Sequence, residues 1–159
     1  MLLRPSHTVG AVLGIDDWND LGCWKEDYDI PLNGYCFFGE DTFGTQFCMD
    51  VRENIHWFEP ETGTFEWIAE TVPSFARWVM HDIDHVTGRT VLGQWEREHG
   101  PLPAGHRLFP KIPFVCGGEF TSSNLASCSD VDSMRFRGAL ARQIRDLEDG
   151  KMIVLRVTE

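Results

Sequence analysis

Short apolar stretches alternate with turn-forming residues in the first half of the chain, a pattern that is typical of β-strands. The apolar stretches are 35–39, 45–49 and 54–58, and the residues between them, 39–41 and 50–53, favour turns. Within the third stretch, apolar and polar side chains alternate with a period of two, as on the two faces of a strand. We therefore predict three consecutive strands joined by tight turns.

A β-hairpin is predicted over residues 54–68. Pro60–Gly63 has strong turn chemistry, because glycine can adopt a positive φ there. Apolar and polar residues alternate on both sides of this turn, in 54–58 and in 64–67. Together with the preceding strands, the hairpin predicts an antiparallel meander.

Further along the chain the apolar residues change to helical spacing. Ser74 can cap a helix, and apolar residues recur after it at intervals of three and four until Gly88 breaks the pattern. A second helical face begins at Val91 and is ended by Gly100 and Pro101. The sequence therefore predicts two helices after the strands.

Short strands are predicted in the last third of the chain. Residues 101–113 contain four prolines and are expected to be extended or looped. Strands are predicted at Phe114–Cys116 and Asn124–Cys128, and a final one at Met152–Val157.

Between these strands, a long helix is predicted from Asp130 or Asp132 to Leu147. Its predicted apolar face consists of Phe136, Leu140, Ile144 and Leu147. The arginines that could hold a phosphate or an acidic group are Arg135, Arg137, Arg142 and Arg145. Because three of them fall roughly opposite the apolar face, we expect a solvated helix surface there.

Strands and helices are grouped rather than alternating, which indicates an α+β fold. We expect a largely antiparallel sheet of about five to six strands flanked by three to four helices. The length of 159 residues fits one domain, 1–159, with its own hydrophobic core. Its first 30 residues are expected to be irregular or short-helical, and acidic.

Five cysteines, an odd number without a C-x-x-C pair, argue against a disulfide framework. We expect free, mostly buried thiols in a reducing compartment. No apolar run approaches the roughly 18 residues of a membrane helix. The short run Val9–Ile15 leads straight into Asp16 and Asp17, with no cleavage site after it. We therefore predict a cytoplasmic protein.

The net charge of −11 is unevenly distributed. Residues 1–66 hold thirteen acids against three bases, whereas residues 67–159 hold twelve acids against eleven bases. An acidic surface disfavours nucleic acid and anionic membranes as partners and favours a basic protein. The alternative is that the acidity only keeps the protein in solution.

A basic partner is expected to contact acids in predicted loops and turns, where side chains can face outward. These candidates are Asp16, Asp17, Asp20, Glu40 and Asp41. Trp18 and Trp24 are candidate anchors, since buried aromatic side chains dominate interface energetics. Burial in the core is the alternative for each tryptophan.

Neither a metal site nor a nucleophile is indicated. His81 and His85 are four residues apart on a predicted helix, but the sequence supplies neither a third ligand nor the glutamate of a zinc protease. Cys116 lacks a neighbouring base and is expected to be a core thiol. We predict no catalytic residue, no metal and no cofactor.

Paired carboxylates are the remaining candidate chemistry. Glu40 and Asp41, together with Glu59 and Glu61, could perform acid–base catalysis if they converged. Carboxylates in turns are usually turn formers, and no His or Lys is nearby in sequence. We therefore interpret them as turn residues.

Several segments, in their order along the chain, resemble a known family. Gly39–Phe47 reads G-E-D-T-F-G-T-Q-F and resembles the D-x-F-G-x-x-F strand pair of the SUKH superfamily. Phe58–Gly63 resembles its central hairpin, and Phe114–Phe120 with Asn124-Leu125 its G-G-x-Y…N-L segment. The resemblance covers about residues 35–157. It is weaker at the front, where only Asp27-Tyr28 echoes the family's L-P-x-D-Y segment.

This resemblance implies a non-enzymatic α+β scaffold that binds another protein. The superfamily takes in fungal cell-wall-assembly regulators and bacterial immunity proteins that neutralise polymorphic toxins, frequently nucleases. It therefore implies an immunity-type protein bound to a basic cognate toxin. The alternatives are a general interaction or regulatory scaffold without a toxin and, more distantly, a hydrolase with an unrecognised site. The oligomeric state is left open.

Overall fold

The computed structural model describes residues 2–148 and Gly150. Its main sheet has five antiparallel strands in the order β1-β2-β3-β4-β5, so each strand pairs with its neighbour in sequence. These strands are β1 (Leu2–Leu3), β2 (Tyr35–Glu40), β3 (Gln46–Asp50), β4 (Ile55–Glu59) and β5 (Thr64–Ala69). A separate antiparallel pair is formed by β6 (His106–Pro110) and β7 (Leu125–Ser129).

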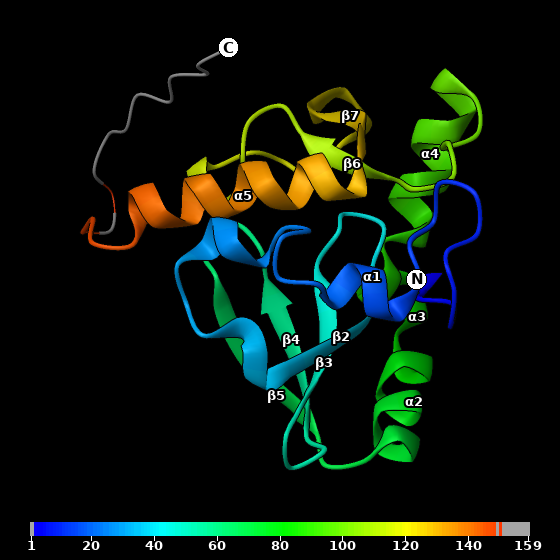
Figure 1. Ribbon diagram of the computed structural model, residues 1–159. Coiled ribbons are helices and arrows are strands. Elements are labelled where there is room, and N and C mark those ends of the chain that lie inside the picture. The colour runs from blue at the N-terminus through cyan, green and yellow to red at the C-terminus, as the bar shows by residue number, and fades with distance from the viewer. Residues whose placement is uncertain (1, 149, 151–159) are drawn as a thin grey trace.

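The helices lie around the main sheet (Figure 1). They are α1 (Ile15–Asn19), α2 (Val72–His81), α3 (Ile83–Thr87), α4 (Arg89–His99) and α5 (Asp130–Ile144). Short 3-10 turns are η1 (Lys25–Tyr28), η2 (Leu32–Gly34), η3 (Phe114–Cys116) and η4 (Ser122–Asn124). In Figure 1, α5 crosses between the main sheet and the β6–β7 pair, while α2, α3 and α4 form a column along one side.

The predicted fold class is confirmed: the architecture is α+β with antiparallel sheets. The predicted hairpin is also confirmed, with Glu59 opposite Thr64 on either side of the Pro60–Gly63 turn. Within the described residues, β6 pairs with β7 alone, so these strands form a second sheet instead of extending the meander. The strand predicted at Met152–Val157 lies outside the described residues.

Of two predictions after the helices, one agrees with the structure and one is wrong. Residues 101–113, expected to be extended or looped, contain the strand β6, whose only proline, Pro110, stands at its last position, where a missing N–H disturbs the ladder least. Phe114–Cys116, predicted as a strand, is the 3-10 turn η3. Pro113 precedes this turn, and Gly117, with φ of 88°, ends it in the left-handed conformation.

The helix predicted after Ser74 is two helices. Thr71 is the N-cap of α2 and accepts a hydrogen bond from the Ser74 N–H, so the cap lies three residues before the predicted one. Asp82, with φ of −145°, ends α2 and caps α3 by accepting from the His85 N–H. The aspartate therefore breaks a helix that the apolar spacing alone would continue.

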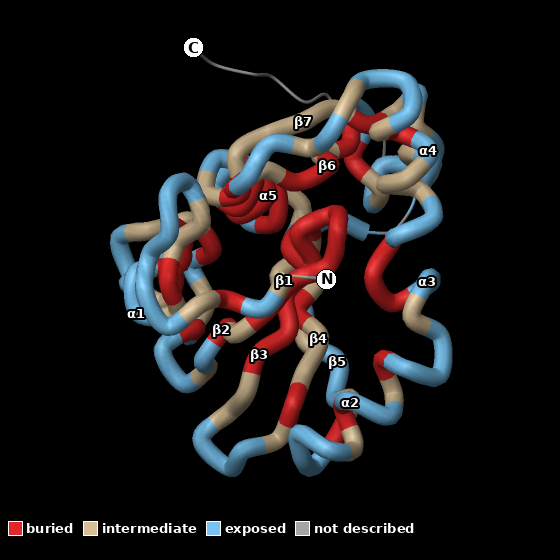
Figure 2. Tube along the Cα trace, turned by 90° about the vertical axis from the view of Figure 1, so that its right-hand side faces the viewer, coloured by how far each residue is buried: buried red, intermediate tan, exposed pale blue. Residues whose placement is uncertain are grey.

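Both faces of the main sheet are buried, because successive residues of a strand point to opposite faces. On β4, Phe58 joins a core cluster with Trp18 and Trp24, whereas Ile55 and Trp57 join a second cluster beneath α2. Figure 2 shows buried residues running along β3 and α5, with exposed residues on the outer turns. No helix in the described part of the chain is long and apolar enough to span a membrane.

The five cysteines are free, but the prediction that most are buried is wrong. Cys48 alone is buried, while Cys36 and Cys116 are exposed. Cys116 ends η3, which lies at the surface instead of in a core strand. Partial burial and the nearby Glu61 raise the pKa of its thiol, which disfavours a reactive thiolate.

Candidate functional site

Three of the predicted contact residues lie together on an exposed surface. Asp16 and Asp17 stand in the first turn of α1, and Asp20 follows its last residue. All three are exposed, as is Glu26 on η1. We call Asp16, Asp17, Asp20 and Glu26 the α1 acidic surface.

Few cations offset the charge of this surface. Lys25 is the only Lys or Arg between Pro5 and Asn33, and it is buried with its Nζ donating to the Tyr35 carbonyl. The nearby arginines pair with neighbouring acids, Arg135 of α5 with Asp27 at 4.0 Å and Arg145, which follows α5, with Asp29 at 3.5 Å. No ion pair of the described residues involves a member of the α1 acidic surface.

The tryptophans proposed as anchors belong to the core. Trp18 and Trp24 are fully buried, and their ring centroids lie 5.5 Å apart. The Trp18 Nε1 donates to Gln46, and the Trp24 Nε1 donates to the Trp18 carbonyl. Because burial and hydrogen bonding satisfy both indoles, neither can anchor a partner from the surface. The exposed apolar residue at this place is Leu21.

Glu40 faces inward, contrary to the prediction. It is fully buried at the end of β2, where its carboxylate pairs with the guanidinium groups of Arg4 and Arg107. Arg4 also pairs with Asp130 at 2.9 Å, and its guanidinium carbon lies 3.5 Å from the Trp18 ring centroid. The sequence shows Glu40 in a turn, but the partners come from distant segments. We call Arg4, Glu40, Arg107 and Asp130 the buried charge network.

Asp41 is also buried, so the prediction of an outward-facing side chain is wrong here too. Its Oδ1 accepts hydrogen bonds from the backbone N–H groups of Phe43 and Thr45, at 2.8 and 2.9 Å, which fixes the turn between β2 and β3. Burial raises the pKa of Asp41 to about 7, although the backbone hydrogen bonds and nearby Arg137 oppose the shift.

Asp41 lines a cavity of about 480 Å³ together with the two glutamates of the following hairpin. Glu59 accepts from the Glu61 N–H at 3.2 Å, and burial raises the pKa of Glu59. Glu61 Oε2 accepts from the Val115 N–H at 2.8 Å. The structure thus brings together three carboxylates that the sequence only suggested as a pair. We call this cavity the carboxylate pocket.

Arg137 is the one arginine that lines the carboxylate pocket. It is 1% exposed, and its Nη1 donates to Ser133 Oγ at 2.9 Å. Gly44, with φ of 85°, makes room for this guanidinium, because a Cβ there would lie 2.8 Å from Nη1. From the sequence, Arg137 was only one of four arginines that could hold an acidic group, and its burial was not predicted. The sequence feature that could have predicted its burial is its spacing of three and four residues from Met134 and Ala141, which places all three on the buried face of α5.

The predicted long-helix face is partly wrong. Leu140 is buried, but Phe136 is 37% exposed and Leu147 is 41% exposed. The buried face instead carries Ser133, Met134, Arg137, Gly138, Leu140 and Ala141. Gly138 lets η1 approach closely, since a Cβ there would lie 2.9 Å from Asp27.

The histidine pair does not form one site. His81 ends α2 and His85 lies in α3, on the other side of the break at Asp82, and both are exposed. Within the described residues, no three His, Cys, Asp or Glu side chains are grouped so that they could hold a metal ion.

Comparison with solved structures identifies a protein of the same fold. The structure of Atu4351 from Agrobacterium tumefaciens superposes with a TM-score of 0.52 at 12% sequence identity. The match covers 73% of this chain and 62% of Atu4351, so the matched region spans less than two thirds of that protein. No protein-family model matches the sequence, and no curated protein is significantly similar to it. At this identity the similarity shows a shared fold alone.

Proposed function

We propose that this protein binds a basic protein through the α1 acidic surface, and that the partner is a toxin which it neutralises. The observation that carries the proposal is the exposure of Asp16, Asp17, Asp20 and Glu26 without a cation paired to any of them among the described residues. The SUKH-like order of motifs supports the toxin-neutralising role. The site of action of such an immunity protein is the cytoplasm.

The surface charge supports a basic partner even after the buried acids are removed from the count. Of the thirteen acids in residues 1–66, seven are exposed, whereas Arg52 is the one exposed base of that region. A surface of one sign accelerates association with a partner of opposite sign. A toxin that acts on nucleic acid must be basic where it meets its substrate, so this surface complements it.

Leu21 adds an exposed apolar side chain next to the α1 acidic surface in the chain. Its side chain is 43% exposed, between Asp20 and Glu26 in sequence. An exposed apolar residue flanked by acids in the chain fits the apolar centre and polar rim of a protein interface. Leu21 takes the anchoring role that the sequence suggested for the tryptophans.

The test is charge reversal at matched positions. The triple variant D16K/D17K/D20K is compared with E66K/E70K/E98K, which changes the net charge equally at exposed acids elsewhere. Binding to the protein encoded beside this one is measured by calorimetry. We expect the first variant to weaken binding by at least about tenfold and the second to leave it nearly unchanged.

Folding and the identity of the partner need their own controls. Asp17 and Asp20 accept local hydrogen bonds, so the variant D16K/E26K, which alters neither, repeats the test with thermal unfolding as the check. Equal weakening by the E66K/E70K/E98K control would refute the α1 acidic surface as the contact. Co-expression that fails to rescue growth from the neighbouring protein would refute neutralisation and leave a general interaction scaffold.

A further inference from the structure

The carboxylate pocket holds more acidic than basic groups. Asp41, Glu59 and Glu61 line it, and Arg137 is the one Lys or Arg among its lining residues. Asp84 at its edge is already paired with Arg89 at 3.1 Å. Burying carboxylates without enough cations is unfavourable. A cationic group entering the cavity would therefore be stabilised.

Two polar atoms in the pocket have no hydrogen-bond partner among the described residues. They are Glu61 Oε1 and Arg137 Nε, which form an ion pair at 4.0 Å, and the two residues are only 2% and 1% exposed. Buried polar atoms are nearly always hydrogen-bonded in folded proteins. Apart from the ion pair with Arg137, Glu61 Oε1 thus remains an unused hydrogen-bond acceptor, on a side chain whose other oxygen accepts from the Val115 N–H.

Aromatic side chains line the pocket beside the carboxylates. Phe114 and Phe120 stack with their ring centroids 3.8 Å apart, and Phe43 meets Phe120 edge-on at 5.2 Å. Phe120 is 57% exposed, so part of this aromatic wall faces solvent. Trp57 also lines the pocket. Aromatic faces attract ammonium and guanidinium groups.

We propose that the carboxylate pocket binds an organic cation, an alkylammonium or guanidinium group, with Glu61 as its hydrogen-bond acceptor. The group comes either from a free amine or guanidine or from a Lys or Arg side chain of a bound peptide. An anion would meet three carboxylates. A metal ion is disfavoured, since no three suitable ligands of the described residues are grouped around one point.

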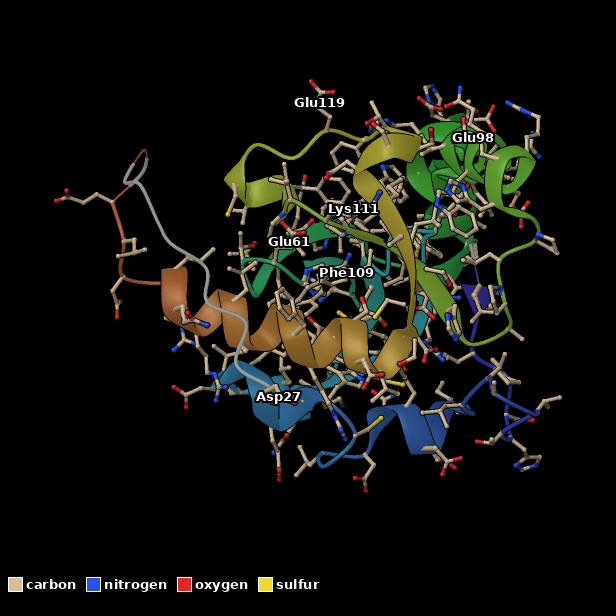
Figure 3. The ribbon with its side chains drawn as sticks, turned by 90° about the horizontal axis from the view of Figure 1, so that it is seen from above. Asp27, Glu61, Glu98, Phe109, Lys111 and Glu119 are labelled. Carbon is tan, nitrogen blue, oxygen red and sulfur yellow. The ribbon has the colours of Figure 1, made fainter. Side chains whose placement is uncertain are left out.

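This site is separate from the α1 acidic surface. On β4, Trp57 and Glu59 point to the α2–α3 side of the sheet, whereas Phe58 points to the cluster that contains Trp18 of α1. In Figure 3, Glu61 and Asp27 of η1 are seen on opposite sides of α5. Loss of binding at one site can therefore be separated from loss at the other.

The experiment is an NMR titration of the full chain with matched probes. Butylammonium and butylguanidinium represent free cations, and Nα-acetyl methylamides of lysine and arginine represent side chains. The corresponding citrulline compound is the neutral isostere of arginine. The backbone amides of Val115 and Thr45 report binding, because they donate to Glu61 and Asp41. We expect the cations, and not citrulline, to shift these amides.

Variants identify the pocket as the place of binding. Glu61→Gln keeps the shape and removes the charge, and we expect it to weaken binding at least about tenfold. Phe120→Ala, at a solvent-exposed position, is expected to weaken it severalfold with little risk to folding. Glu98→Gln is the matched control on α4 and should bind as the wild type does.

The outcomes separate the sources and decide the proposal. Tighter binding of the butyl compounds assigns the pocket to a free cation, and tighter binding of the capped residues assigns it to a peptide side chain. The proposal is overturned if no cation shifts the two amides at millimolar concentration, or if citrulline binds as tightly as arginine. It is also overturned if Phe120→Ala and Glu61→Gln, each shown to be folded, both bind as the wild type does.

Discussion

Asp41 is a buried carboxyl whose charge opposes folding. Its pKa is about 7 in the folded protein, whereas the ordinary value for an aspartate, as in the unfolded chain, is 3.8. Between these two pH values the folded state therefore binds more protons than the unfolded state. By linkage, Asp41 makes the free energy of unfolding fall as the pH rises from about 4 to 7. Above about pH 7 the destabilisation by the Asp41 charge is complete.

The variant Asp41→Asn should remove this pH dependence. The amide oxygen can still accept from the N–H groups of Phe43 and Thr45, but it carries no charge at any pH. We expect the stability of the variant relative to wild type to rise between about pH 4 and pH 8, by at most about 4 kcal/mol. Urea unfolding of the variant and of wild type at about pH 4 and about pH 8 measures this difference in stability.

The control for this experiment is Glu119→Gln, an exposed acid, which should follow the wild-type curve. Parallel pH profiles for Asp41→Asn and wild type would show that Asp41 titrates equally in the folded and unfolded states. The raised pKa of Asp41 in the folded protein would then be refuted.

At the scale of secondary-structure elements, the buried charge network joins four parts of the fold. Arg4 follows β1, Glu40 ends β2, Arg107 lies in β6 and Asp130 begins α5. The strand β1 has only two residues, so its own hydrogen bonds hold it weakly. The network therefore ties the edge of the main sheet to the second sheet and to α5.

Glu40→Gln should destabilise the protein strongly. It leaves Arg4 and Arg107 in the interior without the carboxylate that they share, and breaking a buried pair costs about 3–5 kcal/mol. Chemical denaturation measures the loss, with Glu66→Gln as a solvent-exposed control. The double variant Glu40→Gln/Arg107→Met should lose less than the sum of its single variants. A loss below about 0.5 kcal/mol for Glu40→Gln would contradict the network's role.

At the scale of the whole molecule, charge is sorted between the inside and the outside. Glu40, Asp41 and Glu61 are buried, whereas the α1 acidic surface and other exposed acids dominate the outside of the first 66 residues. The net charge of −11 therefore combines two groups of acids, those buried inside the fold and those exposed on its surface. The charge of Glu40 is offset inside the molecule by Arg4 and Arg107. The α1 acidic surface has no ion pair among the described residues and can attract a basic protein within about one Debye length.

The partner's association rate should depend on salt. We expect the rate constant to fall at least about tenfold between about 0.05 and 0.5 M NaCl, while the dissociation rate changes little. The variant D16K/D17K/D20K should show a flatter dependence, and E66K/E70K/E98K should stay close to wild type. Surface plasmon resonance measures both rates. A salt effect confined to dissociation would place the important charges in a desolvated contact instead.

Periodicity alone determined most of the elements. The strands from Tyr35 to Ala69, their hairpin and α5 follow from local spacing, because a strand or a helix buries a face that repeats along the sequence. Local signals failed where a single residue overrode the pattern. Asp82 split a helix by capping. Around β6 the prolines allowed only an extended or looped segment to be predicted, because the sequence does not show where in a ladder a proline stands.

The placement of charge was decided by tertiary structure. Asp16, Asp17 and Asp20 face solvent as predicted, since a short helix at the surface leaves its polar side exposed. Glu40 and Asp41 also stand next to a turn, yet they are buried. The reason is that burying a carboxylate requires partners. The partners of Glu40 come from segments 36 and 67 residues away, and Arg137 reaches the pocket from α5. Sequence spacing does not encode such distances, so the folded chain alone brings the carboxylate pocket together.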